Sequence, residues 1–206
     1  IVGQAHTGTG KTAAFGLPVL NQLTGKNAEA VVIVPTRELA MQVSDELFKF
    51  GKFLGINTAT VYGGQSYSRQ LKLIETASVI VATPGRFLDL LKNEHIKIKP
   101  KFVILDEADE MLDMGFLDDI KDIFTYLPED RQTLLFSATM PTAIKNLAKT
   151  ILKEPEFVTI TKSDVTNKNI TQTFYVVDEK ERDDALIRLF DYKNPKKSII
   201  FCRTKK

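Results

Sequence analysis

Short apolar runs recur along this chain of 206 residues, and each one ends in glycine, proline or polar residues. They occupy residues 30–34, 58–62, 79–82, 102–105 and 133–136. Strands that are apolar throughout are buried on both faces, which is typical of a parallel sheet covered by helices. Residues 1–3 look like the end of another such strand. The pattern predicts an α/β fold in which a doubly wound parallel sheet is flanked by helices.

Helical patterns fill the intervals between these runs. After Pro141, apolar residues recur at the i, i+3, i+4, i+7 spacing of a helix with one apolar face: Ile144, Leu147, Ala148 and Ile151. Thr83 followed by Pro84 predicts an N-cap and a first helical residue. In open parallel sheets, ligands bind beyond the carboxyl ends of the strands. The residues that follow each apolar run are therefore the candidates for function.

Residues 5–12, Ala-His-Thr-Gly-Thr-Gly-Lys-Thr, have the pattern of a phosphate-binding loop. Gly8 and Gly10 let backbone N–H groups approach a polyphosphate without Cβ clashes. Lys11 adds positive charge for the β- and γ-phosphates, and the Thr12 hydroxyl is placed to ligate Mg²⁺. The general pattern has glycine where this chain has Ala5, and a small residue still allows the turn. The predicted nucleotide-binding residues are Ala5, Thr7, Gly8, Thr9, Gly10, Lys11 and Thr12.

An acidic sequence, Asp106-Glu107-Ala108-Asp109, follows the apolar run at 102–105. A carboxylate pair behind a buried strand suits a magnesium ion and an attacking water. The same residues would also suit a solvated helix start, because helix dipoles favour acidic residues there. The phosphate loop upstream makes ATP, with Mg²⁺, the better interpretation.

Composition limits the classes of partner. With 43% hydrophobic residues the chain can bury one core and part of a second, and its net charge of +2 is too small to attract nucleic acid by bulk charge. The single cysteine, Cys202, excludes an intramolecular disulfide and a multi-cysteine metal site; it lies in an apolar run, where we expect it to be buried. No run approaches the ~20 apolar residues of a membrane span. No signal peptide opens the chain, and we expect a cytoplasmic protein without a membrane partner.

Four more motifs follow apolar runs. Residues 35–40 are Pro-Thr-Arg-Glu-Leu-Ala, 63–64 are Gly-Gly, 83–86 are Thr-Pro-Gly-Arg and 137–139 are Ser-Ala-Thr. With the phosphate loop and the Asp-Glu-Ala-Asp sequence, the chain resembles the DEAD-box ATP-dependent RNA helicases of superfamily 2, of the bacterial type. The resemblance implies a RecA-like P-loop NTPase fold. It also implies RNA-stimulated ATP hydrolysis coupled to local RNA duplex unwinding or RNA–protein remodelling.

The resemblance also implies roles in the chemistry for Lys11, Asp106 and Glu107. Asp106 would hold Mg²⁺ together with Thr12, and Glu107 would orient or deprotonate the water that attacks the γ-phosphate. ATP is then the substrate and Mg²⁺ the cofactor.

RNA contact and coupling are implied in the same way. Asp109 would hydrogen-bond to the hydroxyls of Ser137 and Thr139 and so link hydrolysis to domain closure. Hydroxyls, backbone N–H groups and guanidinium groups suit contacts to the sugar-phosphate backbone of RNA, although Arg37 could instead pair with a neighbouring carboxylate and the glycines could simply make turns. The residues that the resemblance assigns to RNA are Pro35, Thr36, Arg37, Gly64, Thr83, Pro84, Gly85 and Arg86.

We expect a first RecA-like domain at 1–161, a polar linker at 162–169 and the truncated start of a second RecA-like domain at 170–206. The last segment should form a strand at 170–177, a helix at about 179–191 with Asp178 as its N-cap, and a strand at 198–202. The abrupt beginning and end suggest a fragment. In the family, the adenine-reading glutamine motif precedes the phosphate loop and the arginine fingers lie late in the second domain. We therefore expect these residues alone to bind nucleotide weakly and to hydrolyse it negligibly.

Two other functions share these motifs. One is an ATP-gated RNA clamp whose hydrolysis only releases the RNA; the other is a DNA translocase, because no residue here shows recognition of the ribose 2′-OH. We expect a monomer. Ribosome-assembly and RNA-decay proteins are candidate partners.

Overall fold

The computed structural model describes residues 1–6, 8–25, 27–160, 171 and 173–202. The chain divides into two compact units, Ile1–Thr161 and Lys162–Lys206. Thr7, in the phosphate loop, and the predicted linker at 162–169 lie outside the described residues. The two units are described separately below.

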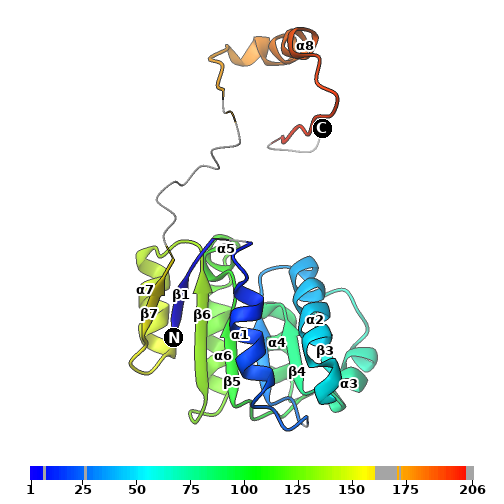
Figure 1. The fold of residues 1–206 in the computed structure, drawn as a ribbon, viewed down its shortest axis with the longest axis vertical. Helices are drawn as coiled ribbons and strands as arrows, with labels where there is room; N and C mark the ends of the chain where they lie inside the picture. Colours follow the sequence, from blue (N-terminus) through cyan, green and yellow to red (C-terminus); the bar gives the residue numbers. More distant parts are fainter. Residues whose placement is uncertain (7, 26, 161–170, 172, 203–206) are drawn as a thin grey trace. The chain divides into compact units, whose positions relative to one another are not determined.

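The first unit contains a sheet of seven parallel strands in the order β3-β4-β2-β5-β6-β1-β7 (Figure 1). The strands are β1 (Val2–Gln4), β2 (Ala30–Ile33), β3 (Thr58–Val61), β4 (Val79–Ala82), β5 (Phe102–Leu105), β6 (Gln132–Ser137) and β7 (Phe157–Thr159). Every apolar run that we interpreted as a strand is one, within a residue or so of the predicted ends. The doubly wound parallel sheet is confirmed.

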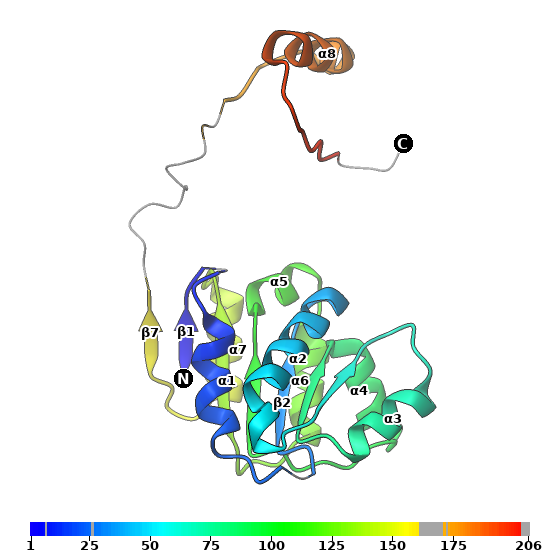
Figure 2. The ribbon, with the colours of Figure 1, turned by 45° about the vertical axis from the view of Figure 1, so that its right-hand side comes forward.

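Helices cover both faces of this sheet (Figures 1 and 2). On one face lie α1 (Lys11–Leu20) and α2 (Arg37–Gly51), which continues into a short 3-10 turn at Lys52–Leu54. On the other face lie α3 (Tyr67–Glu75), α4 (Pro84–Lys92), α5 (Ala108–Asp113), α6 (Leu117–Tyr126) and α7 (Thr142–Ile151). Successive strand residues point to opposite faces. Val32 and Ile104 therefore pack with α1 and α2, whereas Val31 and Val103 pack with the other layer.

Two local predictions about helices hold. The buried residues of α7 are the four at helical spacing, Ile144, Leu147, Ala148 and Ile151. Thr83 stands in extended conformation at the N-cap of α4, and Pro84 is in the first turn, although the Thr83 side chain makes no capping hydrogen bond. Burial of one apolar stripe thus places α7, and the chain direction at Thr83 begins α4 directly after β4.

The second unit differs from expectation. Its described part contains a 3-10 turn at Glu179–Glu181, with Asp178 at its N-cap, and α8 (Arg182–Lys193), so the predicted helix is present. Residues 173–177 and 198–202 form no strand. A strand exists through hydrogen bonds to a neighbour, and these segments have no such neighbour among the described residues. Their side chains are accordingly exposed, and Cys202 is exposed rather than buried.

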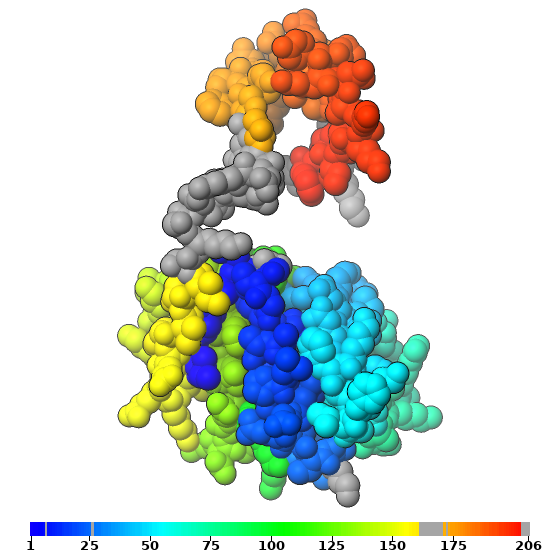
Figure 3. Space-filling view, viewed as in Figure 1, coloured from blue at the N-terminus to red at the C-terminus, as the bar shows by residue number. Residues whose placement is uncertain are grey.

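The face that carries α1 and α2 is shown in Figure 3. α1 and α2 pack against each other there. At the other end of the sheet β7 is exposed along its whole length, and half or more of the side chains of Phe157 and Val158 is accessible to solvent. In the described ranges, no helix combines the length and apolar character needed to cross a membrane.

Candidate functional site

The carboxyl ends of six strands bring the predicted motifs to one edge of the sheet. β5, β6 and β1 are neighbours, and Asp106, Ser137 and the phosphate loop stand at their ends. β3, β4 and β2 form the adjoining part of the sheet, and their ends lead into the glycine doublet at 63–64, Thr83 and Thr36. The predicted nucleotide residues and the predicted RNA residues therefore occupy two halves of one edge, which meet between β2 and β5.

The phosphate loop has the backbone that its glycines allow. Gly8 and Gly10 have φ angles of 81° and 86°, and no atom lies within 4 Å of a Cβ built on either residue. The Thr9 hydroxyl donates to the carbonyl of His6 at 2.7 Å, which closes the turn. The N–H of Ala5 donates to the carbonyl of Ser137 at 3.1 Å and anchors the loop to β6. The loop is thus open to solvent on the side where phosphates would approach.

Lys11 and Asp106 face each other behind this loop. The Lys11 ammonium donates to the carbonyl of Ala5 at 3.3 Å and lies 3.9 Å from the carboxylate of Asp106. Both side chains are more than nine-tenths buried. Burial raises the pKa of Asp106 to about 6, although the positive charge of Lys11 opposes the rise. A cation bound at this carboxylate would favour its ionised form.

Glu107 has an unusual backbone for its residue type. It is the N-cap of α5 with φ 56° and ψ 53°, in the left-handed region. Residues other than glycine seldom occupy this region, and when they do so at a site the strain is often part of the function. The Glu107 N–H donates to the Asp106 carboxylate at 3.0 Å. The two carboxylates are thereby held in a fixed order between β5 and α5.

Asp109 is connected to the segment after β6 by several hydrogen bonds. Its carboxylate accepts from the hydroxyl of Thr139 at 2.9 Å and from the Thr139 N–H at 2.8 Å. Its own N–H donates to the Ser137 hydroxyl at 3.1 Å, and that hydroxyl donates to the carbonyl of Thr139 at 2.7 Å. Burial alone would raise the pKa of Asp109, but the hydrogen bonds from this segment hold it below its usual range. The contacts expected between residues 109, 137 and 139 are present, with Ser137 bonded to the Asp109 backbone.

On the other half of the edge, Thr36 and Arg37 begin α2. The Thr36 hydroxyl accepts from the N–H of Leu39 at 3.2 Å, which caps the helix. Arg37 is exposed, and its guanidinium lies next to Gly64: a Cβ on Gly64 would be 3.4 Å from Nη1 of Arg37. Gly64 has a φ angle of 88°. The structure therefore brings Arg37 and the glycine doublet together from β2 and β3.

Residues 83–86 divide into outward and inward members. Gly85 is exposed, Pro84 is buried and Thr83 is partly buried. Arg86 is turned into the protein with 12% of its side chain accessible. It donates to the carbonyl of Gln65 at 3.0 Å and lies over the ring of Tyr67 at 4.4 Å. The predicted RNA contact of Arg86 stays a prediction, since most of its donors face protein groups.

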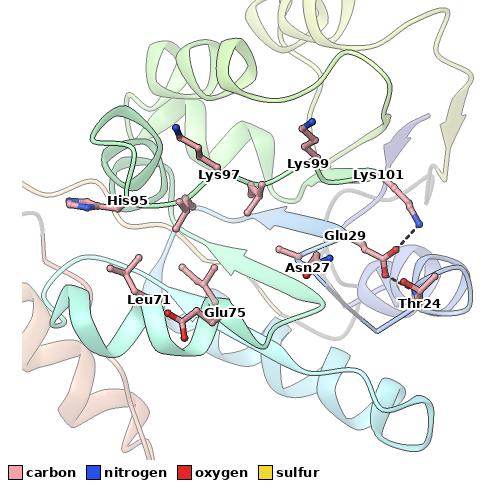
Figure 4. Close-up of a pocket in the computed structure, with 13 residues that line it drawn as sticks. Thr24, Asn27, Glu29, Leu71, Glu75, His95, Lys97, Lys99 and Lys101 are labelled. Atoms are coloured by element: carbon pink, nitrogen blue, oxygen red, sulfur yellow. Dashed lines mark hydrogen bonds and ion pairs between the residues drawn. The ribbon is translucent and has the colours of Figure 1, made fainter.

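A cavity of about 760 Å³ lies elsewhere (Figure 4). It is lined by Glu29 and Lys101, which precede β2 and β5, and by the end of α3. The Lys101 ammonium donates to the Glu29 carboxylate at 2.6 Å, the dashed contact in Figure 4. This cavity is at the amino ends of the strands, opposite the edge with the motifs, and we do not assign it to the nucleotide.

Comparison with known proteins decides the family. The family model described as DEAD/DEAH box helicase matches residues 1–147. This chain belongs to the DEAD/DEAH box helicase family. The DEAD-box ATP-dependent RNA helicase RhpA of Helicobacter pylori is 59% identical over the whole chain, and CshA of Bacillus subtilis is 46% identical. The chain spans 42% of the length of each of these relatives.

Solved structures of DEAD-box proteins share the fold. The crystal structure of a DEAD box protein from Methanococcus jannaschii matches 92% of this chain and 52% of its own, with a TM-score of 0.76 and 42% identity. A structure described as a hypothetical ATP-dependent RNA helicase from Sulfolobus tokodaii matches 77% of this chain and 47% of its own, with a TM-score of 0.71 and 40% identity. The recognised family and the predicted fold are thus confirmed.

Sequence reasoning missed one buried polar residue near the DEAD-box motifs. Gln70 in α3 is 0% exposed. Its amide donates to the carbonyl of Tyr62 at 2.8 Å, and its carbonyl oxygen accepts from Arg86 at 3.4 Å. The available signal was its spacing, because Gln70 stands four residues before Ile74 and so lies on the buried face of α3.

Proposed function

We propose that this chain is the ATP-binding part of an ATP-dependent RNA helicase. The observation behind the proposal is the division of one sheet edge into a phosphate-loop half on β1, β6 and β5 and an open glycine and guanidinium half on β2, β4 and β3. ATP would bind at the first half and the sugar-phosphate backbone of RNA at the second. Hydrolysis would be stimulated by RNA and coupled to local unwinding or RNA–protein remodelling.

The chain's own residues suit nucleotide binding. The N–H groups around Gly8 and Gly10 would receive the phosphates, with Lys11 leaving the carbonyl of Ala5 to meet the β/γ oxygens. In the described residues, no group of three or more His, Cys, Asp or Glu is placed to hold a metal on its own. Mg²⁺ commonly uses one or two carboxylates together with substrate phosphates. Asp106 and the Thr12 hydroxyl, both hard oxygen donors, fit that arrangement.

Bound Mg²⁺ would neutralise charge that develops on the phosphate oxygens. Glu107 would orient the attacking water and accept its proton, since its position is fixed at the start of α5 beside Asp106. Asp109 would transmit the state of this site to the segment after β6 through its bonds to Thr139.

On the RNA half, Arg37, Thr36 and the N–H groups of the glycine turn would contact phosphates and sugars. Helix starts such as that of α2 favour anions because N–H groups point outward from them. Such contacts do not distinguish base sequence. A cytoplasmic location belongs to this proposal as well, and fractionation of cells would test it.

The test is ATP hydrolysis by the full-length protein, with and without single-stranded RNA, beside Glu107→Gln. We expect RNA to stimulate turnover, and we expect Glu107→Gln to abolish turnover while ATP affinity is kept. Glu110→Gln is the matched control, because Glu110 is an exposed carboxylate in the same helix. Equal stimulation by single-stranded DNA would contradict the RNA assignment, and full turnover by Glu107→Gln would contradict the role of Glu107.

A further inference from the structure

Two buried polar groups meet under the turn that contains the glycine doublet. Gln70 is fully buried on α3, and Arg86 on α4 is mostly buried. Buried amides and guanidinium groups are costly unless they are hydrogen-bonded, so their partners indicate what they are retained for. In the described structure, both groups bond to the ends of the turn at 62–65.

The contacts form a closed set around this turn. The Gln70 amide donates to the carbonyl of Tyr62 at 2.8 Å, at the start of the turn. The Arg86 guanidinium donates to the carbonyl of Gln65 at 3.0 Å, at its end. The same guanidinium nitrogen lies 3.4 Å from the side-chain oxygen of Gln70, which joins the two supports. The side chain of Gln65 also donates to the hydroxyl of Tyr62.

Arg86 is itself fixed in place. Its guanidinium lies over the ring of Tyr67 at 4.4 Å, and its Nε is 3.9 Å from the carboxylate of Asp89. The hydroxyl of Tyr67 donates to that same carboxylate. Cation–π contact and the ion pair together hold a planar donor in one orientation. Three sides of the guanidinium are thus occupied by protein groups.

The turn that these groups support needs support. Gly64 has a φ angle of 88°, and glycine is the residue with the most conformational freedom to lose when a chain is ordered. Two adjacent glycines would populate many conformations without external contacts. Hydrogen bonds at both ends select the one in which Gly64 lies against Arg37.

We propose that Gln70 and Arg86 are positioning residues that hold the 62–65 turn in the conformation that receives the RNA backbone. They act through the carbonyls of Tyr62 and Gln65 and do not themselves bind phosphate. The inference rests on the proposed RNA function and assigns a role to Gln70, which lies outside the recognised motifs. It also replaces the expected direct contact of Arg86 by an indirect one.

The experiment measures binding of labelled single-stranded RNA to the full-length protein over a range of salt concentrations. The variants are Gln70→Leu, Arg86→Gln and the double variant, and Arg69→Gln serves as control because Arg69 is an exposed cation on the same helix. We expect each single change to weaken RNA binding roughly 5–10-fold, the effect of losing about one buried hydrogen bond. The double variant should be no weaker than the singles, since both act through one turn.

Salt dependence separates positioning from direct contact. A lost phosphate contact on a single strand lowers the slope of log K against log salt by roughly 0.7. We expect the slope to be unchanged in Gln70→Leu and Arg86→Gln. The concentration of RNA that half-maximally stimulates hydrolysis should rise, while ATP affinity and the maximal rate are kept. Arg69→Gln should bind RNA within about twofold of wild type.

Gln70→Glu guards against simple misfolding, because a carboxylate still accepts from Arg86 but has no N–H for the carbonyl of Tyr62. We expect it to bind RNA with an affinity between those of wild type and Gln70→Leu. Wild-type RNA binding by both Gln70 variants, additive losses in the double variant, or a reduced slope in Arg86→Gln would each overturn the inference. Absence of RNA binding by the wild-type protein would instead overturn the proposed function, and the inference with it.

Discussion

The ammonium of Lys11 lies 3.9 Å from the carboxylate of Asp106, and both groups are almost completely buried. The pair joins the first helical residue after the phosphate loop to the first residue after β5. Because burial raises the pKa of Asp106 and Lys11 opposes the rise, each group depends on the other in the ligand-free structure. Arrival of a nucleotide would replace this contact by one between Lys11 and phosphate.

Lys11→Ala should weaken ATP binding. The ammonium supplies charge-assisted hydrogen bonds to phosphate, so we expect about 10–100-fold lower affinity by calorimetry. Lys49→Ala, which removes an exposed lysine of α2, is the control and should bind ATP normally. Unchanged affinity in Lys11→Ala would contradict the assignment of this loop to phosphates.

The two glycines of the doublet should respond differently to alanine. A Cβ on Gly64 would meet the Arg37 guanidinium at 3.4 Å, and the φ angle of 88° disfavours any side chain. We expect Gly64→Ala to lower RNA affinity and to cost about 1–2 kcal/mol of stability from the left-handed backbone. Nothing lies within 4 Å of a Cβ on Gly63, so Gly63→Ala is the matched control. Equal RNA affinities for the two variants would show that the geometry of this turn does not matter for binding.

Thr139→Val tests the connection between α5 and the segment after β6. The change removes the hydroxyl that donates to Asp109 at 2.9 Å, while the N–H of Thr139 still donates. We expect a loss of about 1 kcal/mol in unfolding free energy. RNA-stimulated hydrolysis should fall at unchanged ATP affinity. Thr142→Val, at the exposed start of α7, should leave both unchanged; if Thr139→Val does the same, Thr139 has no part in coupling.

Glu29 gives a pH-dependent contribution to stability. Its burial would raise its pKa, but hydrogen bonds from Lys101 and Thr24 leave the pKa below its usual value. A lowered carboxyl pKa stabilises the fold above the unfolded-state pKa, and this contribution is lost as pH falls through the folded-state pKa. Glu29→Gln should therefore lower the unfolding free energy by about 1–2 kcal/mol at pH 7.

Denaturant unfolding at several pH values checks this prediction. The difference between wild type and Glu29→Gln should shrink as the solution becomes more acidic than the Glu29 pKa. Glu94→Gln is the control, because the Glu94–Lys97 pair is mostly exposed and such pairs contribute little. A difference that stays constant down to strong acid would mean that the charge of Glu29 is not what stabilises the fold.

The sequence was most informative where burial dictates the residue type. The strands β4 and β5 occupy the predicted residues, because a strand buried on both faces must be apolar throughout. The motifs fell at strand ends, so parallel topology alone brought them to one edge. The roles of the individual site residues remain predictions that the experiments above address.

Other features depend on tertiary contacts that a single sequence does not show. The strand order, the left-handed backbone of Glu107 and the inward direction of Arg86 all follow from neighbours that are distant in the chain. The strands expected at 170–177 and 198–202 were wrong for a related reason. Their composition favours extended chain, but a sheet also needs partners for the backbone.

The ladder between β2 and β5 sets how near the two ligands' motifs are to each other. Ile33 pairs with Leu105, and the N–H of Asp106 donates to the carbonyl of Ile33 at 3.0 Å. The peptide before the proposed metal ligand therefore shares a hydrogen bond with the strand that leads into Thr36 and Arg37. A tilt of one peptide plane at Asp106 would be felt within a few bonds by the residues proposed for RNA. Communication between the two ligands, on this reading, has a built-in path only one hydrogen bond wide.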